Sequence, residues 1–177
     1  HPPTREVDFF HFPHEEDRSP HHPADRVHDV GDVEIARRRL ASFCDVFVED
    51  TALLLDGHAV ITRPGAASRA PETSSTAAGL AGHFELHRIK QGYVDGGDVL
   101  RIGKTLYVGL SSRTDLEGIE TLRELVRPLG FEVVHARLDG CLHLKTGCSY
   151  AGAGVVVVNP RWVDAQLLER EGLNLVM

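Results

Sequence analysis

A chain of 177 residues with 42% hydrophobic composition can bury one good core, so its length predicts one domain and at most two. The net charge of −7 argues against a nucleic-acid surface, and the absence of any run of about eighteen apolar residues argues against a membrane span. The start of the chain has no signal-peptide pattern and the three cysteines fit no disulfide framework, so we expect free thiols and a cytoplasmic protein.

Residues 1–34 have the composition of an acidic, poorly ordered tail. They hold nine acidic side chains, five of the nine prolines and six of the eleven histidines, and no apolar period runs through them. The histidines could be metal ligands, but the fixed spacing of a structural metal site is missing, which favours a solvated tail. We expect residues 35–177 to form a single domain.

The pattern after the tail predicts a strand, strand, helix, strand unit. A short amphipathic helix over 34–43 leads into it. Two strands are joined by Asp56-Gly57, a dipeptide typical of hairpin turns. The elements of the unit are predicted as strands at 46–55 and 58–64, a helix at 73–82 and a strand at 84–89.

The same order of elements recurs twice. In the second unit, Thr114 and Glu117 predict a capping box that opens a helix, and Gly130 predicts its end. Corresponding points lie 45 to 49 residues apart, so we expect an α/β protein of ββαβ repeats that stack to bury their faces. The strands are predicted at 98–103, 105–112 and 131–138, and then at 141–150, 154–160 and 174–177, with a third helix at 163–172. The repeats span about 46–90, 95–138 and 141–177.

Polar side chains stand near the start of each repeat. They are Glu49 and Asp50, then Asp95 and Asp98, then His143. An unpaired carboxylate is expensive in a dry site, so these carboxylates predict a cationic partner. Arg69 and Arg113 follow the first two hairpins and can fork onto a carboxylate, which together predicts a pocket for an amino acid with a guanidinium side chain. The alternative for each residue taken alone is structural: a turn cap, a satisfied histidine or a solvated arginine.

Three blocks carry a resemblance to a known family: FVEDTALLLDGHAVITRPGAASR, DGGDVLRIGKTLYVGLSSRT and GCLHLKTG. They resemble consecutive motifs of dimethylarginine dimethylaminohydrolases, in the amidinotransferase superfamily that also includes arginine deiminases, and the resemblance covers about residues 46–177. It implies a pentein-like, five-bladed α/β propeller with the substrate at its centre, of which this chain carries three blades. It also implies hydrolysis of a methylated arginine to citrulline and a methylamine, with neither cofactor nor metal.

The resemblance implies a role for six residues. Asp95 would hold the substrate guanidinium and His143 would donate a proton to the departing amine. Glu49 and Asp50 would bind the cationic parts of the substrate, and Arg69 and Arg113 its α-carboxylate end. A cysteine thiolate would attack the guanidinium carbon, eject the amine and leave a thiouronium that water resolves.

The cysteines depart from the family pattern. Cys44 stands where the family usually has an aspartate, and the family nucleophile belongs to a segment near the end of the fifth blade, beyond Met177. Cys141, two residues before His143 on the expected strand, and Cys148 are better read as small core residues, so we expect negligible turnover by this chain alone. One alternative is a catalytically inactive or truncated guanidine-binding or interaction protein, whose open edge would favour association into a homo-oligomer. The other is an arginine or agmatine deiminase.

Overall fold

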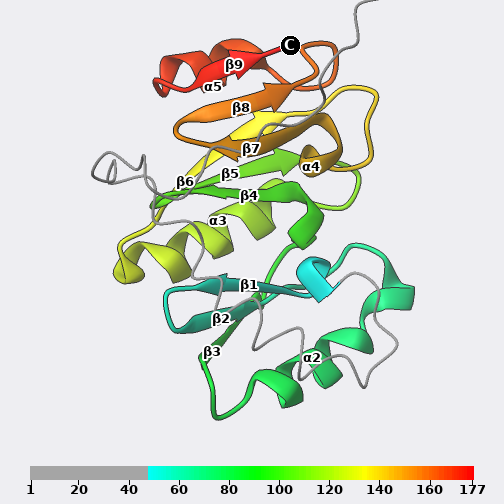
Figure 1. The fold of residues 1–177 in the computed structure, drawn as a ribbon. Helices are drawn as coiled ribbons and strands as arrows, with labels where there is room; N and C mark the ends of the chain where they lie inside the picture. The colour runs from blue at the N-terminus through cyan, green and yellow to red at the C-terminus, as the bar shows by residue number, and fades with distance from the viewer. Residues whose placement is uncertain (1–47) are drawn as a thin grey trace, which may run out of the picture.

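The structure, a computed structural model, describes residues 48–177. These residues form three small sheets that are stacked one after another along the molecule (Figure 1). In each sheet the first two strands pair antiparallel and the third pairs parallel with the second, after a helical crossover. The predicted α/β fold of ββαβ repeats is therefore confirmed. The tail and the helix expected over 34–43 lie outside the described residues, and the predicted domain boundaries stay a prediction.

Each repeat contains a helical turn before its first strand. The first repeat consists of η2 (Val48–Asp50), β1 (Ala52–Leu55), β2 (His58–Ile61), η3 (Ala67–Arg69), α2 (Glu72–Leu80) and β3 (Glu85–Arg88). The second consists of η4 (Gly96–Asp98), β4 (Val99–Ile102), β5 (Thr105–Leu110), α3 (Leu116–Val126), η5 (Arg127–Leu129) and β6 (Glu132–Arg137). The third consists of α4 (Leu144–Gly147), β7 (Cys148–Gly152), β8 (Val155–Val158), α5 (Ala165–Arg170) and β9 (Asn174–Val176).

Local turn chemistry explains the hairpin of the first repeat. Asp56 and Gly57 have φ angles of 49° and 87°, so both adopt the left-handed conformation that a tight hairpin turn requires. Leu55 then pairs with His58 across the turn. The hairpin predicted at this dipeptide is confirmed.

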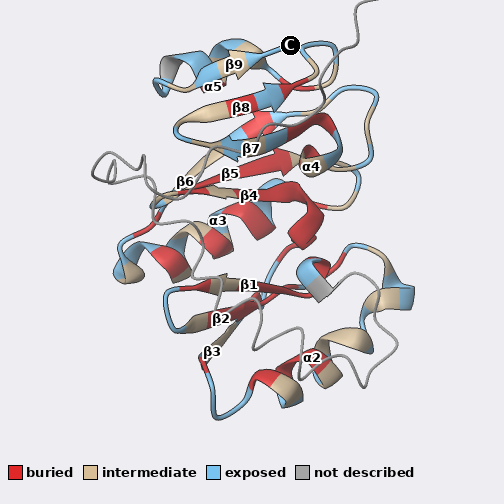
Figure 2. Cartoon of the chain, viewed as in Figure 1, coloured by how far each residue is buried: buried red, intermediate tan, exposed pale blue. Residues whose placement is uncertain are grey.

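The repeats are held together by apolar side chains between neighbouring sheets. Helix α3 lies between the first and second sheets (Figure 1), and its Ile119 and Leu122 are fully buried against residues of both. Val60 comes from the first sheet and Leu106 from the second, and each is also fully buried. Full burial of one such side chain contributes about 1.5 to 3 kcal/mol. The band of buried residues continues through the sheets of all three repeats (Figure 2), so stacking buries faces that one repeat leaves open.

Two local predictions are wrong. The strand expected over 141–150 begins only at Cys148, because Leu144 and the residues after it form the short helix α4. The expected capping role of Thr114 belongs to Asp115, whose Oδ1 accepts a hydrogen bond from the Gly118 N–H at 2.7 Å. In both cases a residue distant in the sequence engages the group in question: Asp98 accepts hydrogen bonds from the Leu144 N–H and from the Thr114 hydroxyl.

No helix of residues 48–177 has the length and apolar character needed to cross a membrane.

Candidate functional site

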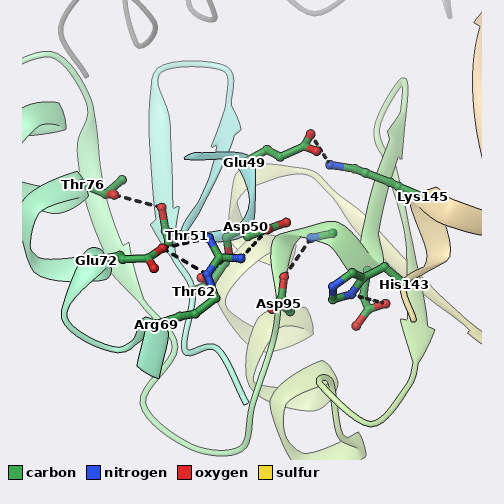
Figure 3. A network of polar contacts seen from close by, with 12 residues as sticks. Glu49, Asp50, Thr51, Thr62, Arg69, Glu72, Thr76, Asp95, His143 and Lys145 are labelled. Atoms are coloured by element: carbon green, nitrogen blue, oxygen red, sulfur yellow. Dashed lines mark hydrogen bonds and ion pairs between the residues drawn. The ribbon is translucent and has the colours of Figure 1, made fainter. Parts of the chain in front are cut away.

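The helical turns that precede the first strands bring the three repeats together. Turn η2 contacts η4, and η4 contacts α4. These turns carry the polar residues singled out in the sequence, with His143 at the N-cap of α4. Asp50, Asp95 and His143 consequently lie close together, although they come from three separate repeats (Figure 3).

Two glycines of η4 make this close approach possible. A Cβ atom on Gly96 would lie 1.9 Å from the carbonyl oxygen of Glu49. A Cβ atom on Gly97 would lie 3.0 Å from Asp50 Oδ1 and 3.0 Å from Cγ of the His143 ring. The bare backbone at Gly97 therefore lies between the Asp50 carboxylate and the His143 imidazole, where a side chain would push them apart.

Asp95 is a buried carboxylate with few partners. Its side chain is the N-cap of η4 and accepts a hydrogen bond from the Gly97 N–H at 3.2 Å, while the residue is only 1% exposed. Burial raises the pKa of Asp95, the Gly97 N–H opposes that shift, and the negative charge of Asp50 raises the pKa further. Electrostatic interaction with His143 and with Arg69 opposes the shift. A bound cation would relieve the cost of ionising Asp95 in this place.

Asp98 is the polar centre of the contact between the second and third repeats. It is fully buried, and its Oδ2 accepts hydrogen bonds from the hydroxyls of Ser111 at 2.6 Å and Thr114 at 2.7 Å. Its Oδ1 accepts a hydrogen bond from the Leu144 N–H at 3.0 Å. This bond fixes the first turn of α4 to the second repeat, which is why the segment is a helical turn here and not a strand.

His143 is positioned through this contact. Its Nδ1 atom lies 3.4 Å from Asp98 Oδ1, and within the described residues this buried nitrogen forms no hydrogen bond. The side chain retains 18% exposure, so the ring is neither sealed in the core nor free in solvent. Asp98 thus positions His143 in two ways. It binds the backbone N–H of the next residue, Leu144, and its carboxylate lies beside the His143 ring.

Arg69 lies within the first repeat and is shared between two carboxylates. Its guanidinium forms an ion pair with Asp50 and donates to Glu72 Oε2 from Nη2 at 2.8 Å and from Nε at 3.1 Å. The hydrogen bond with Glu72 raises the pKa of Arg69, burial opposes that rise, and Asp50 adds to it. Arg69 therefore neutralises Asp50 from the side away from His143 (Figure 3).

The remaining two predicted residues lie at the edge of this group. Glu49 is largely exposed, and its Oε2 lies 3.0 Å from Nζ of Lys145, an ion pair between the first and third repeats. Arg113 is half-buried, and its backbone packs against Gly65. No hydrogen bond or ion pair involves its guanidinium among residues 48–177, so that group is available to a ligand.

Three contributors to the site differ from what the sequence predicts. Asp98 is expected to face a cationic partner, but its hydrogen-bond donors are two hydroxyls and a backbone N–H. The local pattern assigns Thr114 to a helix cap. Thr114 instead accepts a hydrogen bond from the Asp95 N–H at 3.0 Å and donates to Asp98. Lys145 gave no signal beyond standing two residues after His143. Asp98 and Lys145 contact residues of other repeats, and Thr114 contacts residues 16 and 19 positions away, so local patterns carry no information about these partners.

The two cysteines of the described residues are poor nucleophiles. Cys141 lies in a loop, not on the predicted strand, and its Sγ donates to the carbonyl oxygen of His143 at 3.5 Å. Its pKa is raised by burial and by the charges of Asp98 and Asp139. Cys148 is buried, and burial raises the pKa of its thiol to about 11. A thiolate is the reactive form, so neither residue is activated at neutral pH.

Three ββαβ repeats whose entry turns gather carboxylates and a histidine define a protein of the α/β-propeller class. The family model described as arginine deiminase matches residues 47–174, and the chain belongs to this family. A dimethylarginine dimethylaminohydrolase of Streptomyces coelicolor is 41% identical over 114 residues, which are 63% of this chain and 44% of the relative. One of Pseudomonas aeruginosa is 35% identical over 133 residues, which are 70% of this chain and 52% of the relative. The chain thus spans about half the length of these curated relatives.

Solved structures show the same fold. A mutant of the Pseudomonas aeruginosa dimethylarginine dimethylaminohydrolase complexed with citrulline superposes with a TM-score of 0.66 at 28% identity, covering 82% of this chain and 63% of that one. The N-terminal domain of a cyanobacterial arginine dihydrolase, bound to its product, gives a TM-score of 0.63 at 23% identity and covers 75% of this chain and 52% of that one. The second likeness concerns the fold alone.

Proposed function

We propose that this chain supplies the guanidinium-binding and proton-donating part of a dimethylarginine dimethylaminohydrolase. The reaction would convert a methylated arginine to citrulline and a methylamine. The observation that carries the proposal is the meeting of Asp50, Asp95 and His143 from three repeats around the bare backbone of Gly97. The relatives of that name and the structure bound to citrulline support the same substrate class.

Asp95 is the best candidate to hold the substrate guanidinium. It is buried, it accepts a single hydrogen bond from the backbone, and its pKa is raised by burial and by the charge of Asp50, although Arg69 opposes that rise. A guanidinium placed there would gain charge-assisted hydrogen bonds, each worth about 1.5 to 3 kcal/mol. Asp50 lies on the other side of Gly97 and would share this cation, although Arg69 already engages one of its oxygens.

The other predicted residues fit supporting roles. Glu49 is exposed beside Lys145 and would meet a cationic part of the substrate at the mouth of the site. Arg113 is half-buried, and its guanidinium is suited to the substrate α-carboxylate. Arg69 would have to divide its donors between such a carboxylate, Asp50 and Glu72.

The chemistry also needs a thiolate. Its sulfur would bond to the guanidinium carbon, and the methylamine would leave with a proton from His143. Water would then add to the thiouronium and release citrulline and the thiolate. Because the pKa values of both Cys141 and Cys148 are raised, the proposal assigns the nucleophile to a different cysteine.

Calorimetric titration of the 177-residue chain with dimethylarginine and with citrulline tests the binding half of this proposal. We expect weak binding, at millimolar concentration, that Asp95→Ala weakens by about tenfold or more, the equivalent of one charge-assisted hydrogen bond. His143→Ala should weaken it less, since its proposed role is proton transfer. Glu124→Ala, which removes an exposed carboxylate of α3, is the control.

The binding proposal has a clear contrary result. If neither ligand binds at millimolar concentration, or if Asp95→Ala binds as well as the parent, the pocket is not assembled in this chain. The inactive interaction protein would then be the better interpretation.

Arginine deiminase chemistry is the second candidate, because the matching family model carries that description. The two reactions differ in the amine that leaves, so arginine and dimethylarginine should be compared under identical conditions. Preference for dimethylarginine supports the proposal, whereas equal or stronger binding of arginine favours the deiminase.

A further inference from the structure

A second polar cluster lies away from the site described above, where strands β2 and β3 run side by side. It consists of His58 on β2 and Glu85 and His87 on β3. His58 stands directly after the hairpin turn, at the opposite end of the first sheet from η2 (Figure 1). His58 pairs with Glu85 in the parallel register, and His87 pairs with Val60, so alternation along the strands places the three side chains on one face.

The ligating atoms of this cluster are close enough to share one ion. His58 Nδ1 lies 3.2 Å from His87 Nε2 and 3.4 Å from Glu85 Oε2, and His87 Nε2 lies 3.8 Å from Glu85 Oε1. Tetrahedral Zn²⁺ with bonds of about 2.0 to 2.1 Å to nitrogen separates two ligand atoms by about 3.3 Å. The two nitrogens are therefore spaced like two corners of a tetrahedron, and rotation of the exposed Glu85 side chain would bring one of its oxygens to a third corner.

We propose that His58, Glu85 and His87 bind a divalent transition metal ion, with Zn²⁺ as the best match and a water molecule in the fourth position. Two imidazoles and one carboxylate are a ligand set that zinc accepts. Within residues 48–177 this is the single group of three or more His, Cys, Asp or Glu side chains whose ligating atoms all lie within 4.8 Å of one another. The ion would clamp β3 to β2 and would take no part in the guanidine chemistry.

The other repeats show that the fold itself does not require these histidines. By strand register, the place of His58 is taken by Thr105 in the second repeat and by Val155 in the third. The place of His87 is taken by Val134 and by Val176. Packing of the sheet therefore requires no imidazole at either position. Binding of a ligand would explain why the first repeat has histidines at both.

A simple hydrogen bond between the two rings is the competing explanation. One imidazole nitrogen would donate to the other across 3.2 Å, and Glu85, whose side chain is 69% exposed, would remain a loose surface partner. That arrangement accounts for the contact of the rings. Glu132 holds the place of Glu85 in the second repeat with no histidine at the equivalent positions beside it, so the paired histidines, and not the carboxylate, are the feature that favours a metal ion.

The test uses the full chain with Zn²⁺ or Co²⁺ alone. The six histidines of residues 1–34 can also bind metal, so the total amount of metal bound does not test the site. The test is therefore a comparison of metal binding between variants. The variant pair is His58→Thr and His87→Val, which installs the residues of the equivalent second-repeat positions. His135→Gln, which removes an exposed histidine of β6 outside the cluster, is the matched control.

Competition for Zn²⁺ against a chromophoric chelator should reveal one tight equivalent in the parent and in His135→Gln. Each cluster variant should bind that equivalent at least about tenfold more weakly, and the double variant should lose it. With Co²⁺, the visible absorption typical of tetrahedral coordination should follow the same order. Zn²⁺ should also raise the Tm of the parent but not of the double variant, because the three-residue site is assembled only in the folded state.

Equal stoichiometry, affinity and Co²⁺ spectrum in the parent and the double variant would overturn the proposal and assign all binding to the tail. Circular dichroism of the metal-free proteins checks that the variants fold. Should the histidine variants fail to fold, Glu85→Gln provides the same test at an exposed position. Loss of at least about tenfold in affinity supports the site, and unchanged affinity contradicts it.

Discussion

Asp98→Asn changes one buried atom and should still destabilise the protein strongly. The Asp98 carboxylate accepts three hydrogen bonds, from Ser111, Thr114 and the Leu144 N–H. The Ser111 hydroxyl oxygen already accepts from the N–H groups of Arg113 and Thr114, and the Thr114 hydroxyl oxygen accepts from the Asp95 N–H. Both hydroxyl protons are therefore committed to Asp98.

An asparagine amide cannot satisfy these partners in either orientation. In one orientation its NH₂ group would face the two hydroxyl donors, and in the other it would face the Leu144 N–H. In each case two hydrogen-bond donors would face each other without an acceptor. Loss of a hydrogen bond to a charged group costs about 1.5 to 3 kcal/mol, and a buried donor without an acceptor costs about 1 to 3 kcal/mol. Allowing for partial relaxation, we expect the free energy of unfolding to fall by about 3 kcal/mol.

Urea denaturation measures this loss, with the fluorescence of Trp162, the single tryptophan of the chain, as the probe. Asp95→Asn is the matched control, because that carboxylate accepts one backbone hydrogen bond and its pKa is already raised. The control should change stability by less than about 1 kcal/mol. A loss below about 0.5 kcal/mol for Asp98→Asn, or a loss equal to that of the control, would refute this account of the junction.

Three further predictions concern Asp95, the two cysteines and the glycines of η4. The pKa of Asp95 is higher in the folded protein than its value of 3.8 in the unfolded chain. The free energy of unfolding of the parent should therefore fall as the pH rises from 3.8 through the folded pKa. The stability of Asp95→Asn relative to the parent should therefore increase across that window in urea titrations at stepped pH, and parallel pH curves would contradict this. The 177-residue chain assayed alone should release citrulline from dimethylarginine no faster than buffer, since the pKa values of Cys141 and Cys148 are raised; release at enzymatic rates that either Cys→Ser change abolishes would show otherwise. Gly96→Ala should cost about 2 to 3 kcal/mol in thermal or urea unfolding, because its Cβ would lie 1.9 Å from a backbone carbonyl oxygen of the first repeat. Gly97→Ala should cost less, because its 3.0 Å contacts are with side chains that can move, and the reverse order would be evidence against the reasoning.

The sequence by itself determined the repeats and most of their elements. Apolar periodicity predicted the strand, strand, helix, strand order, and the Asp56-Gly57 turn is confirmed by the positive φ angles of both residues. Gly130, with a φ of 79°, ends the helical segment of the second repeat as predicted. These features are local: the residues that decide them are within one turn or one strand of each other. The family motifs also point to Asp95 and His143 as candidate site residues.

The tertiary structure alone decided which partners these residues have. The sequence predicts Thr114 as a helix cap. Its hydroxyl instead donates to Asp98 and accepts from the Asp95 N–H, because the loop after β5 lies beside η4. The strand expected through His143 gives way to α4, because Asp98 holds the Leu144 N–H from another repeat. His58 and His87 are 29 residues apart, and only the parallel register of β2 and β3 brings their rings together. Hydrogen-bond partners and metal ligands are chosen by distance in space, which local sequence patterns do not encode.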